Sequence, residues 1–197
     1  MADPRPARTR QALLGAAHEL IVEKGVAGLR IAEITERAEV ALGSFYNHFA
    51  TKEELVEAVV AEALAALAAE MIPAEQGAGD PAVAAITALR RFIRLAYEDE
   101  PFSRLLVNLS RGEEVFLGAI GPFAHTALER TAAAGTFEIE DVDVAVATTV
   151  GGGLSLIRQI LEGQIGPGAD AVYARSVLRG FGVHPRQAAR IIKATDQ

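Results

Sequence analysis

The sequence predicts an all-α protein, and three observations lead to that fold class. Alanine and leucine dominate a composition that is 50% hydrophobic and 23% charged, as in an ordinary folded protein. Apolar residues keep helical spacing along nearly the whole chain, whereas runs of alternating β-branched residues are scarce. Clusters of proline and glycine separate the helical segments. We therefore expect nine to ten helices, arranged as a three-helix domain over residues 1–51 and a longer helical domain over residues 52–197.

The first helix is expected from about Arg8 to Lys24, after the prolines at the start of the chain. Gly25 follows it as the C-terminal stop. The residues expected on its buried side are Leu13, Ala17, Leu20 and Ile21.

Two short helices follow, with a tight connection between them. From Ile31, apolar residues recur at i, i+3 and i+7, which is the spacing of a short helix with one buried stripe. Three residues, Glu39 to Ala41, then lead into a second short helix. On that helix Ala41, Phe45 and Phe49 share a side that suits a protein core, because successive helical residues are rotated by about 100°. The opposite side, which suits a ligand, carries Gly43, Ser44, Tyr46 and Asn47.

A long fourth helix is expected from Lys52 to about Met71, roughly 30 Å at 1.5 Å per residue. Thr51 and Glu54 form the Thr-x-x-Glu pattern of a capping box, in which each side chain satisfies a free backbone N–H at the helix start. This helix would join the first domain to the second.

Two short helices joined this tightly form a helix-turn-helix, whose second member can enter a DNA major groove about 12 Å wide. A resemblance to the TetR family of one-component transcriptional regulators runs through ITERAEVALGSFYNHFATKEEL. The matching positions are Ile34, Ala38, Val40, Gly43, Phe45, Tyr46, Phe49, Lys52 and Leu55. The resemblance extends back through RQALLGAAHELIVEKGVAGLRI and so covers about the first quarter of the chain. The other three quarters resemble the family only in helical layout.

Three features depart from the family pattern. Glu39 stands where the family usually has a turn glycine, so a β-carbon enters a turn that often needs positive φ, at a cost of about 1 kcal/mol. Ala41 replaces a serine or threonine at the start of the recognition helix and loses a side-chain cap worth about 1 kcal/mol. Leu29 and Arg30 replace a threonine pair, and an arginine can hold a phosphate more strongly than a hydroxyl can.

The resemblance implies that the recognition helix reads a palindromic operator as part of a two-fold homodimer. The implied DNA-binding residues are Arg30, Ala41, Leu42, Gly43, Ser44, Tyr46, Asn47, His48 and Lys52. In this set the leucine, serine and asparagine are expected at base edges, the glycine at a close backbone approach, and the tyrosine, histidine, lysine and arginine at phosphates. The alternatives are that Tyr46 is a core residue, His48 an ordinary surface residue and Lys52 a solvated helix-start residue.

The net charge of −7 argues against a protein that coats nucleic acid without specificity, so DNA contact must come from local placement of charge. Arg5, Arg8 and Arg10 form a basic N-terminal arm that could neutralise phosphates. Solvated surface charge is the alternative for each of them.

The second domain is expected to begin after a proline- and glycine-rich break, Pro73 to Pro81, the best candidate for a hinge or mobile loop. The expected helices are Pro81 to Glu98, Pro101 to about Leu109, Glu113 to Ala134 with a bend at Gly121-Pro122, Asp141 to Glu162, Asp170 to Gly182, and Pro185 to about Ala194. The resemblance implies a homodimer through Asp141–Glu162 and Asp170–Gly182, paired as a four-helix bundle. Three consecutive glycines from Gly151 cost about 1 kcal/mol each in a helix, which is tolerated where two backbones approach closely; a kink without such contact is the alternative.

The resemblance further implies that a small-molecule effector binds the second domain and releases the dimer from DNA. The candidate effector-binding residues are Phe92, Tyr97, Phe102, Leu106, Asn108, Phe116, Phe123 and His125, with Arg111 and Arg158 as further polar contacts. An apolar or aromatic effector is expected. For the aromatic residues ordinary core packing is the alternative, and for His125 a surface pair with Glu129 is favoured over a metal site.

Several classes of function find no support in the sequence. There are no cysteines, which excludes disulfides and thiolate chemistry. No charge-free run of about 18 apolar residues and no secretion signal are present, so we expect a cytoplasmic protein without a membrane partner. The histidines are isolated and no nucleophile, metal or phosphate-loop motif occurs, so no catalytic residue, metal or cofactor is expected. The remaining alternative is a DNA-binding protein that lacks a small-molecule effector.

Overall fold

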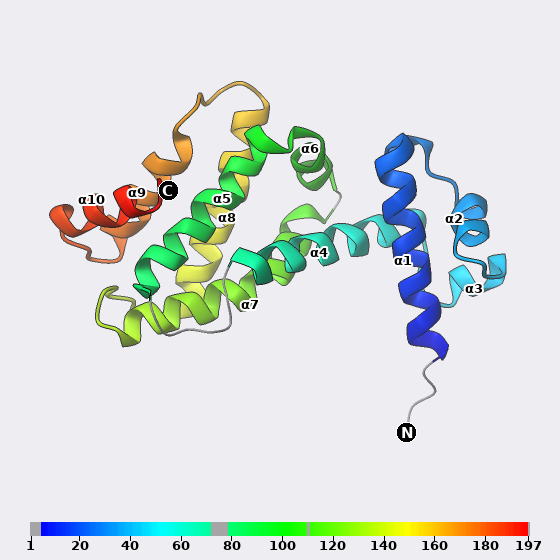
Figure 1. Ribbon diagram of the computed structural model, residues 1–197, viewed down its shortest axis with the longest axis horizontal. Coiled ribbons are helices and arrows are strands. Elements are labelled where there is room, and N and C mark those ends of the chain that lie inside the picture. Colours follow the sequence, from blue (N-terminus) through cyan, green and yellow to red (C-terminus); the bar gives the residue numbers. More distant parts are fainter. Residues whose placement is uncertain (1–4, 72–78, 110, 197) are drawn as a thin grey trace. The chain divides into compact units, whose positions relative to one another are not determined.

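The computed structural model describes residues 5–71, 79–109 and 111–196, and within these ranges the secondary structure is helical, with turns and loops between the helices and no strand. It divides into two compact units, Met1–Ala63 and Leu64–Gln197. The helices are α1 (Arg5–Lys24), the 3-10 turn η1 (Val26–Gly28), α2 (Ile31–Arg37), α3 (Leu42–Tyr46), α4 (Lys52–Met71), α5 (Pro81–Glu98), α6 (Glu100–Asn108), α7 (Gly112–Ala133), α8 (Val142–Leu161), α9 (Ala169–Gly180) and α10 (Pro185–Ala194) (Figure 1).

The first unit is built around α1, which begins one turn earlier than the sequence indicates and ends, as expected, before Gly25 at a φ of 72°. The predicted Leu13, Ala17 and Leu20 are buried, whereas Ile21 is half-buried. The unit also takes in the first three turns of α4, so the boundary falls after Ala63 and not after residue 51 as predicted. The buried residues of these turns are Leu55, Val56, Val59 and Val60. An apolar face of this kind belongs to the core that it helps to form, and a boundary placed at the helix start leaves it out.

The second unit packs α5, α7 and α8 side by side, with α6 against α8 and with α9 and α10 against α5 (Figure 1). Three of its helices, α5, α6 and α8, begin at an aspartate N-cap. Asp80 accepts a hydrogen bond from the Ala82 N–H at 2.9 Å, and Asp141 accepts one from the Val144 N–H at 3.0 Å. Helix α7 continues through Pro122 as one element. Most of the expected break Pro73–Pro81 lies outside the described residues.

Helix α8 is the one helix in the described ranges that is long and apolar enough, by length and composition, to cross a membrane. The core helix of a folded domain can meet the same criterion. Here one side of α8, including Val150, Leu154 and Ile157, is buried, and the helix lies against α5, α6 and α7. The packing therefore accounts for the apolar character of that side.

One of the three consecutive glycines in α8, Gly152, has an explanation within this chain. Tyr173 of α9 places its hydroxyl 2.9 Å from the carbonyl oxygen of Thr149 and 3.3 Å from that of Thr148. A β-carbon at Gly152 would collide with that hydroxyl. Within one chain the close approach at Gly152 is therefore between the Tyr173 side chain and the α8 backbone; the approach of two helix backbones in a dimer stays a prediction.

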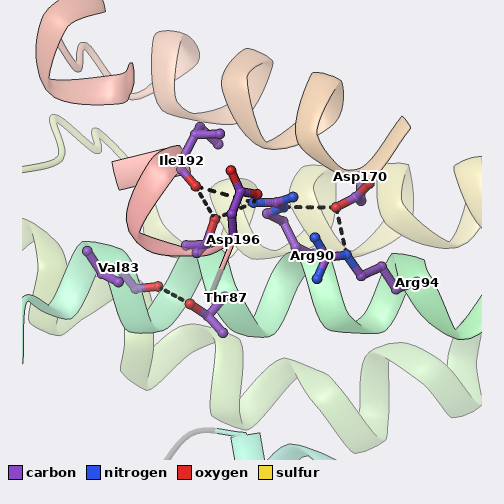
Figure 2. Close-up of polar contacts among 8 residues, drawn as sticks. Val83, Thr87, Arg90, Arg94, Asp170, Ile192 and Asp196 are labelled. Atoms are coloured by element: carbon purple, nitrogen blue, oxygen red, sulfur yellow. Dashed lines mark hydrogen bonds and ion pairs between the residues drawn. The ribbon is translucent and has the colours of Figure 1, made fainter. Parts of the chain in front are cut away.

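A buried arginine joins α5 to the C-terminal helices (Figure 2). Arg90 donates from Nε to Asp170 at 2.8 Å, and from Nη1 to the Ile192 carbonyl at 3.3 Å, to Asp196 at 2.7 Å and to the Thr195 hydroxyl. Arg94 donates to the same Asp170 oxygen at 3.0 Å. Arg90 and Asp170 are both only 4% exposed, so this cluster fixes α9 and α10 on one side of α5.

Candidate DNA interface and effector cavity

The connection between α2 and α3 has the geometry that the sequence indicates. Ala38 ends α2, and Glu39 adopts a φ of +55°, the only positive φ among the non-glycine residues that the structure describes. The Val40 N–H then donates to the Thr35 carbonyl at 3.0 Å, which closes the turn. The expected left-handed residue is therefore present, and a glutamate occupies a position that glycine adopts at lower cost.

Helix α3 separates a buried side from an exposed side. Phe45 and Phe49 are buried with their ring centroids 5.9 Å apart, as predicted. On the other side Leu42 is 53% exposed and Tyr46 57% exposed, which is unusual for large apolar or aromatic side chains. Ala41, predicted on the core-facing side, is exposed, because it is the extended N-cap residue before α3 and not part of the helix. Of the remaining candidates, Gly43 and Asn47 are exposed, whereas Ser44 and His48 are half-buried. The exposed side of α3 therefore presents a small surface of apolar and polar side chains to a partner.

The N-termini of α3 and α4 are capped differently. Ala41 occupies the N-cap position of α3 without a side-chain hydrogen bond, so backbone N–H groups at this exposed helix start are left for another acceptor. At α4 the Glu54 N–H donates to the Thr51 hydroxyl at 3.1 Å, as the capping box predicts. The carboxylate of Glu54, however, accepts from the Ala50 N–H at 2.7 Å, one residue before the expected donor.

Two basic side chains, those of Arg30 and Lys52, flank α3 in the sequence and differ in their contacts with the protein. Arg30 is exposed at the N-cap of α2, while the Lys52 ammonium lies 3.4 Å from the Leu29 carbonyl. The expected basic arm is instead the first turns of α1. There Arg10 stacks over the Phe49 ring at 5.4 Å and pairs with Glu62 at 3.5 Å, so it stabilises the unit itself, whereas Arg8 stays exposed.

Ion pairs hold α2 on α1. Arg37 donates to Glu23 at 2.6 Å and to Glu19 at 3.4 Å. The hydrogen bond from Arg37 lowers the pKa of Glu23, and a contact with Lys24 lowers the pKa of Glu33. These groups are solvated, so they serve to orient α2 more than to stabilise the fold.

A cavity of about 60 Å³ lies inside the second unit. Its lining residues are Ala85, Ile86, Ala88, Leu89, Phe92, Phe116, Ile120, Ala124, Ala127, Leu128, Phe137, Thr149, Val150, Gly153 and Val177. The Phe92 and Phe116 rings meet edge to face at 6.1 Å. Because one water molecule needs about 10–15 Å³ by the same measure, the space admits roughly four to six, comparable with the bulk of one small ring.

Two of the eight candidate effector residues, Phe92 and Phe116, line this cavity. The others do not: Leu106 is buried elsewhere, Phe102 and Phe123 are half-buried, and Tyr97 and Asn108 are exposed. His125 lies 3.4 Å from Glu129 and 3.5 Å from Asp143, and no group that could hold a metal ion is found among the described residues. Of the two further polar contacts considered, Arg111 pairs with Glu114 and Arg158 donates to the Val107 carbonyl at 3.4 Å.

Sequence reasoning missed the small residues of the cavity. Alanines at positions 85, 88, 124 and 127, together with Gly153, lie on three facing helices. Small side chains on facing helices leave a gap that large ones would fill. Helical spacing could have marked these positions as inward-facing, but it did not show which helices face one another.

Comparisons with known proteins agree with both units. Residues 13–59 match the family model described as bacterial regulatory proteins, tetR family, and residues 80–194 match the tetracyclin repressor-like C-terminal domain. The structure of RolR in complex with resorcinol is 30% identical, covers 98% of this chain and 95% of that chain, and has a TM-score of 0.81. RolR without ligand is 30% identical over 95% of this chain and 96% of that one, with a TM-score of 0.74.

Curated relatives match over a shorter stretch. The HTH-type transcriptional regulator YxbF of Bacillus subtilis (strain 168) is 39% identical over 59 residues, which is 29% of this chain and 16% of that protein. The HTH-type transcriptional repressor DhaR of Mycobacterium sp. (strain GP1) is 46% identical over 44 residues, 22% of each. The matched stretch thus spans less than a quarter of either relative. Together with the two matched family domains, these similarities show that the chain belongs to the TetR family of DNA-binding transcriptional regulators.

Proposed function

We propose that this regulator is a repressor that binds a palindromic operator as a homodimer and is released from it by a small aromatic effector. The observation that carries the proposal is the apolar cavity among α5, α7 and α8 of the second unit. An effector-independent DNA-binding protein would be expected to have a solidly packed body at this place. The atoms that line an empty cavity lose packing contacts, so the cavity lowers the stability of the fold. Such a cavity is more readily retained in a protein where a ligand fills it.

The exposed side of α3 supports the DNA-binding half of the proposal. Leu42, Ser44 and Asn47 can contact base edges, with leucine against a thymine methyl group and asparagine toward adenine. Tyr46, His48, Lys52 and Arg30 can contact phosphates, which position the protein without reading sequence.

Exposed apolar residues on α8 and α9 support the homodimer. Val144 is 58% exposed and Val172 is 56% exposed, one on each of the helices expected to pair with a second copy. Large apolar side chains that remain in water favour burial against a partner. A two-fold dimer would then place two copies of α3 about 34–36 Å apart, in successive major grooves.

The effector chemistry follows from the lining of the cavity. Phe92, Phe116 and Phe137 offer ring edges and faces to an aromatic molecule, and no charged side chain lines the space. RolR, which is similar over almost the whole chain, has been solved with resorcinol. A ligand that prefers the released state must differ in affinity between the two states, typically by 5- to 150-fold, and DNA weakens its binding by the same factor.

A glycine substitution tests the effector half of the proposal. A β-carbon at Gly153 meets no atom within 4 Å, so Gly153→Ala places a methyl group into the cavity without a clash. We expect the variant to bind operator DNA as the wild type does but to need a several-fold higher phenol or resorcinol concentration for release, measured by fluorescence anisotropy of labelled operator.

The matched control is Gly118→Ala, the same change at an exposed position of α7 that also has open space around it. It should leave release unchanged. If neither phenol nor resorcinol releases the wild type, or if both alanine variants respond alike, the cavity is not the effector site.

A further inference from the structure

We propose that the hydroxyl of Thr149 is the hydrogen-bonding contact that selects a neutral aromatic effector with a single hydroxyl group. This inference rests on the proposed effector site and names the chemistry of its ligand. Thr149 carries the only polar side chain among the described residues that line the cavity. The other lining side chains that a ligand would meet there are apolar, and Gly153 has none.

The Thr149 hydroxyl differs from those of other helical threonines in the same unit. Thr87 donates to the Val83 carbonyl at 2.8 Å (Figure 2), Thr131 to the Ala127 carbonyl at 2.8 Å and Thr148 to the Val144 carbonyl at 2.8 Å. Each thus satisfies its hydroxyl on the preceding turn of its own helix. The hydroxyl of Thr149 forms no hydrogen bond with any residue in the described ranges, so it remains able to bond a ligand.

The backbone at Thr149 is held in place from outside the cavity. The Tyr173 hydroxyl donates to the Thr149 carbonyl at 2.9 Å, in the space that Gly152 leaves open. Burial raises the pKa of Tyr173, so this hydroxyl keeps its proton and its role as a donor over the neutral range. A fixed backbone gives the threonine side chain a defined position, which lowers the entropy cost of binding.

The rest of the lining excludes other ligand classes. A carboxylate would lose its hydration without a charged partner in the cavity, which is strongly unfavourable. A second hydroxyl on the ring would be left without a polar side chain to bond, and an unmatched buried hydroxyl weakens binding. A phenol is neutral near pH 7, because phenolic groups have a pKa of about 10, and its single hydroxyl matches the single hydroxyl of Thr149.

Calorimetric titration of the full chain, without DNA, tests this assignment. The ligands are phenol, toluene, benzoate and resorcinol, and the variants are Thr149→Val, Thr149→Ser and, as a matched control on α5, Thr87→Val. We expect phenol to bind the wild type more tightly than benzoate or resorcinol. Thr149→Val should weaken phenol binding about 3- to 10-fold, the worth of one neutral hydrogen bond, and leave toluene within about twofold. Thr149→Ser should restore phenol binding, and Thr87→Val should match the wild type.

Unchanged phenol binding by Thr149→Val, or an equal loss for phenol and toluene, would overturn the assignment, because the second result shows a packing role alone. In either case release of operator DNA by phenol would still support the proposed function. If none of the four compounds binds the wild type, the inference and the proposed effector cavity fail together.

Discussion

Glu39 is the residue whose conformation is least suited to its side chain. A φ of +55° costs an ordinary residue about 1–2 kcal/mol relative to glycine, although glycine gives back part of this through its freedom in the unfolded chain. We therefore expect Glu39→Gly to raise the free energy of unfolding by about 0.5–1 kcal/mol, measured by urea denaturation. The same change removes a negative charge beside the recognition helix and should tighten DNA binding in general.

Glu39→Gln separates these two effects, because it removes the charge and keeps the β-carbon. It should tighten DNA binding without stabilising the fold. Equal stabilisation by the glycine and glutamine variants would show that charge, not backbone strain, determines the cost at this position.

Tyr46 and Asn47 are adjacent exposed residues with different expected tasks. Tyr46→Ala should weaken binding to all DNA sequences by a similar factor, since a phosphate contact carries no sequence information. Asn47→Ala should change the preference among sequences, by about 1–3 kcal/mol at one base pair if the side chain reads a base edge. Binding to a library of operator variants measures both. Indistinguishable profiles for the two variants would refute this division of roles.

At the scale of elements, Asp170 links α9 to α5. Removing one partner of a buried ion pair leaves the other charge uncompensated, so Asp170→Asn should destabilise the second unit by about 3 kcal/mol. Asp196→Asn is the matched control, because that carboxylate also pairs with Arg90 but its side chain is 56% exposed. We expect it to cost less than about 1 kcal/mol. A similar cost for both changes would contradict the role given to burial.

The same pair predicts how stability depends on pH. Burial disfavours the ionised form of Asp170, but the hydrogen bond and charge of Arg90, with the charge of Arg94, outweigh it and lower the pKa. A carboxyl whose pKa falls on folding gives stability that is fully present above the ordinary aspartate pKa near 4 and is lost as the pH falls through the folded value. Thermal unfolding between pH 7 and pH 3 should show this acid loss in the wild type and a smaller one in Asp170→Asn.

Local signals in the sequence predicted the elements well. The glycine stop after α1, the capping box before α4 and the two-faced pattern of α3 depend on neighbours in sequence. The contacts that sequence reasoning missed join distant residues. Arg90 and Asp170 are 80 positions apart, and Tyr173 reaches back to the carbonyl of Thr149. No helical period reveals which such pairs meet.

The cavity shows the same limit at the scale of the whole chain. The aromatic side chains Phe92 and Phe116 were found by their position on an apolar face, yet Tyr97, Phe102 and Phe123 have similar patterns and do not line the space. Whether an apolar residue packs tightly or borders a gap is decided by the size of the residues opposite it. That information is present only once α5, α7, α8 and α9 are assembled.

The proposed assembly depends on the exposed apolar side of α8 and α9. Val144→Asp puts a charge where a partner helix would bury a valine, so it should shift the protein toward monomer by sedimentation analysis. Operator affinity should fall with it, since one half-site supplies only half of the contacts. The helical content should stay as in the wild type, because Val144 is 58% exposed within one chain. A dimer that survives this change would place the interface elsewhere.

The most direct test of a dimeric DNA reader is to map, by nuclease protection, the sites on genomic DNA that the purified protein covers. We predict protected sites built as inverted repeats, with half-site centres one helical turn or a multiple of it apart, and loss of protection with Tyr46→Ala. Protection of sites without two-fold symmetry, or protection that survives Tyr46→Ala unchanged, would contradict the account.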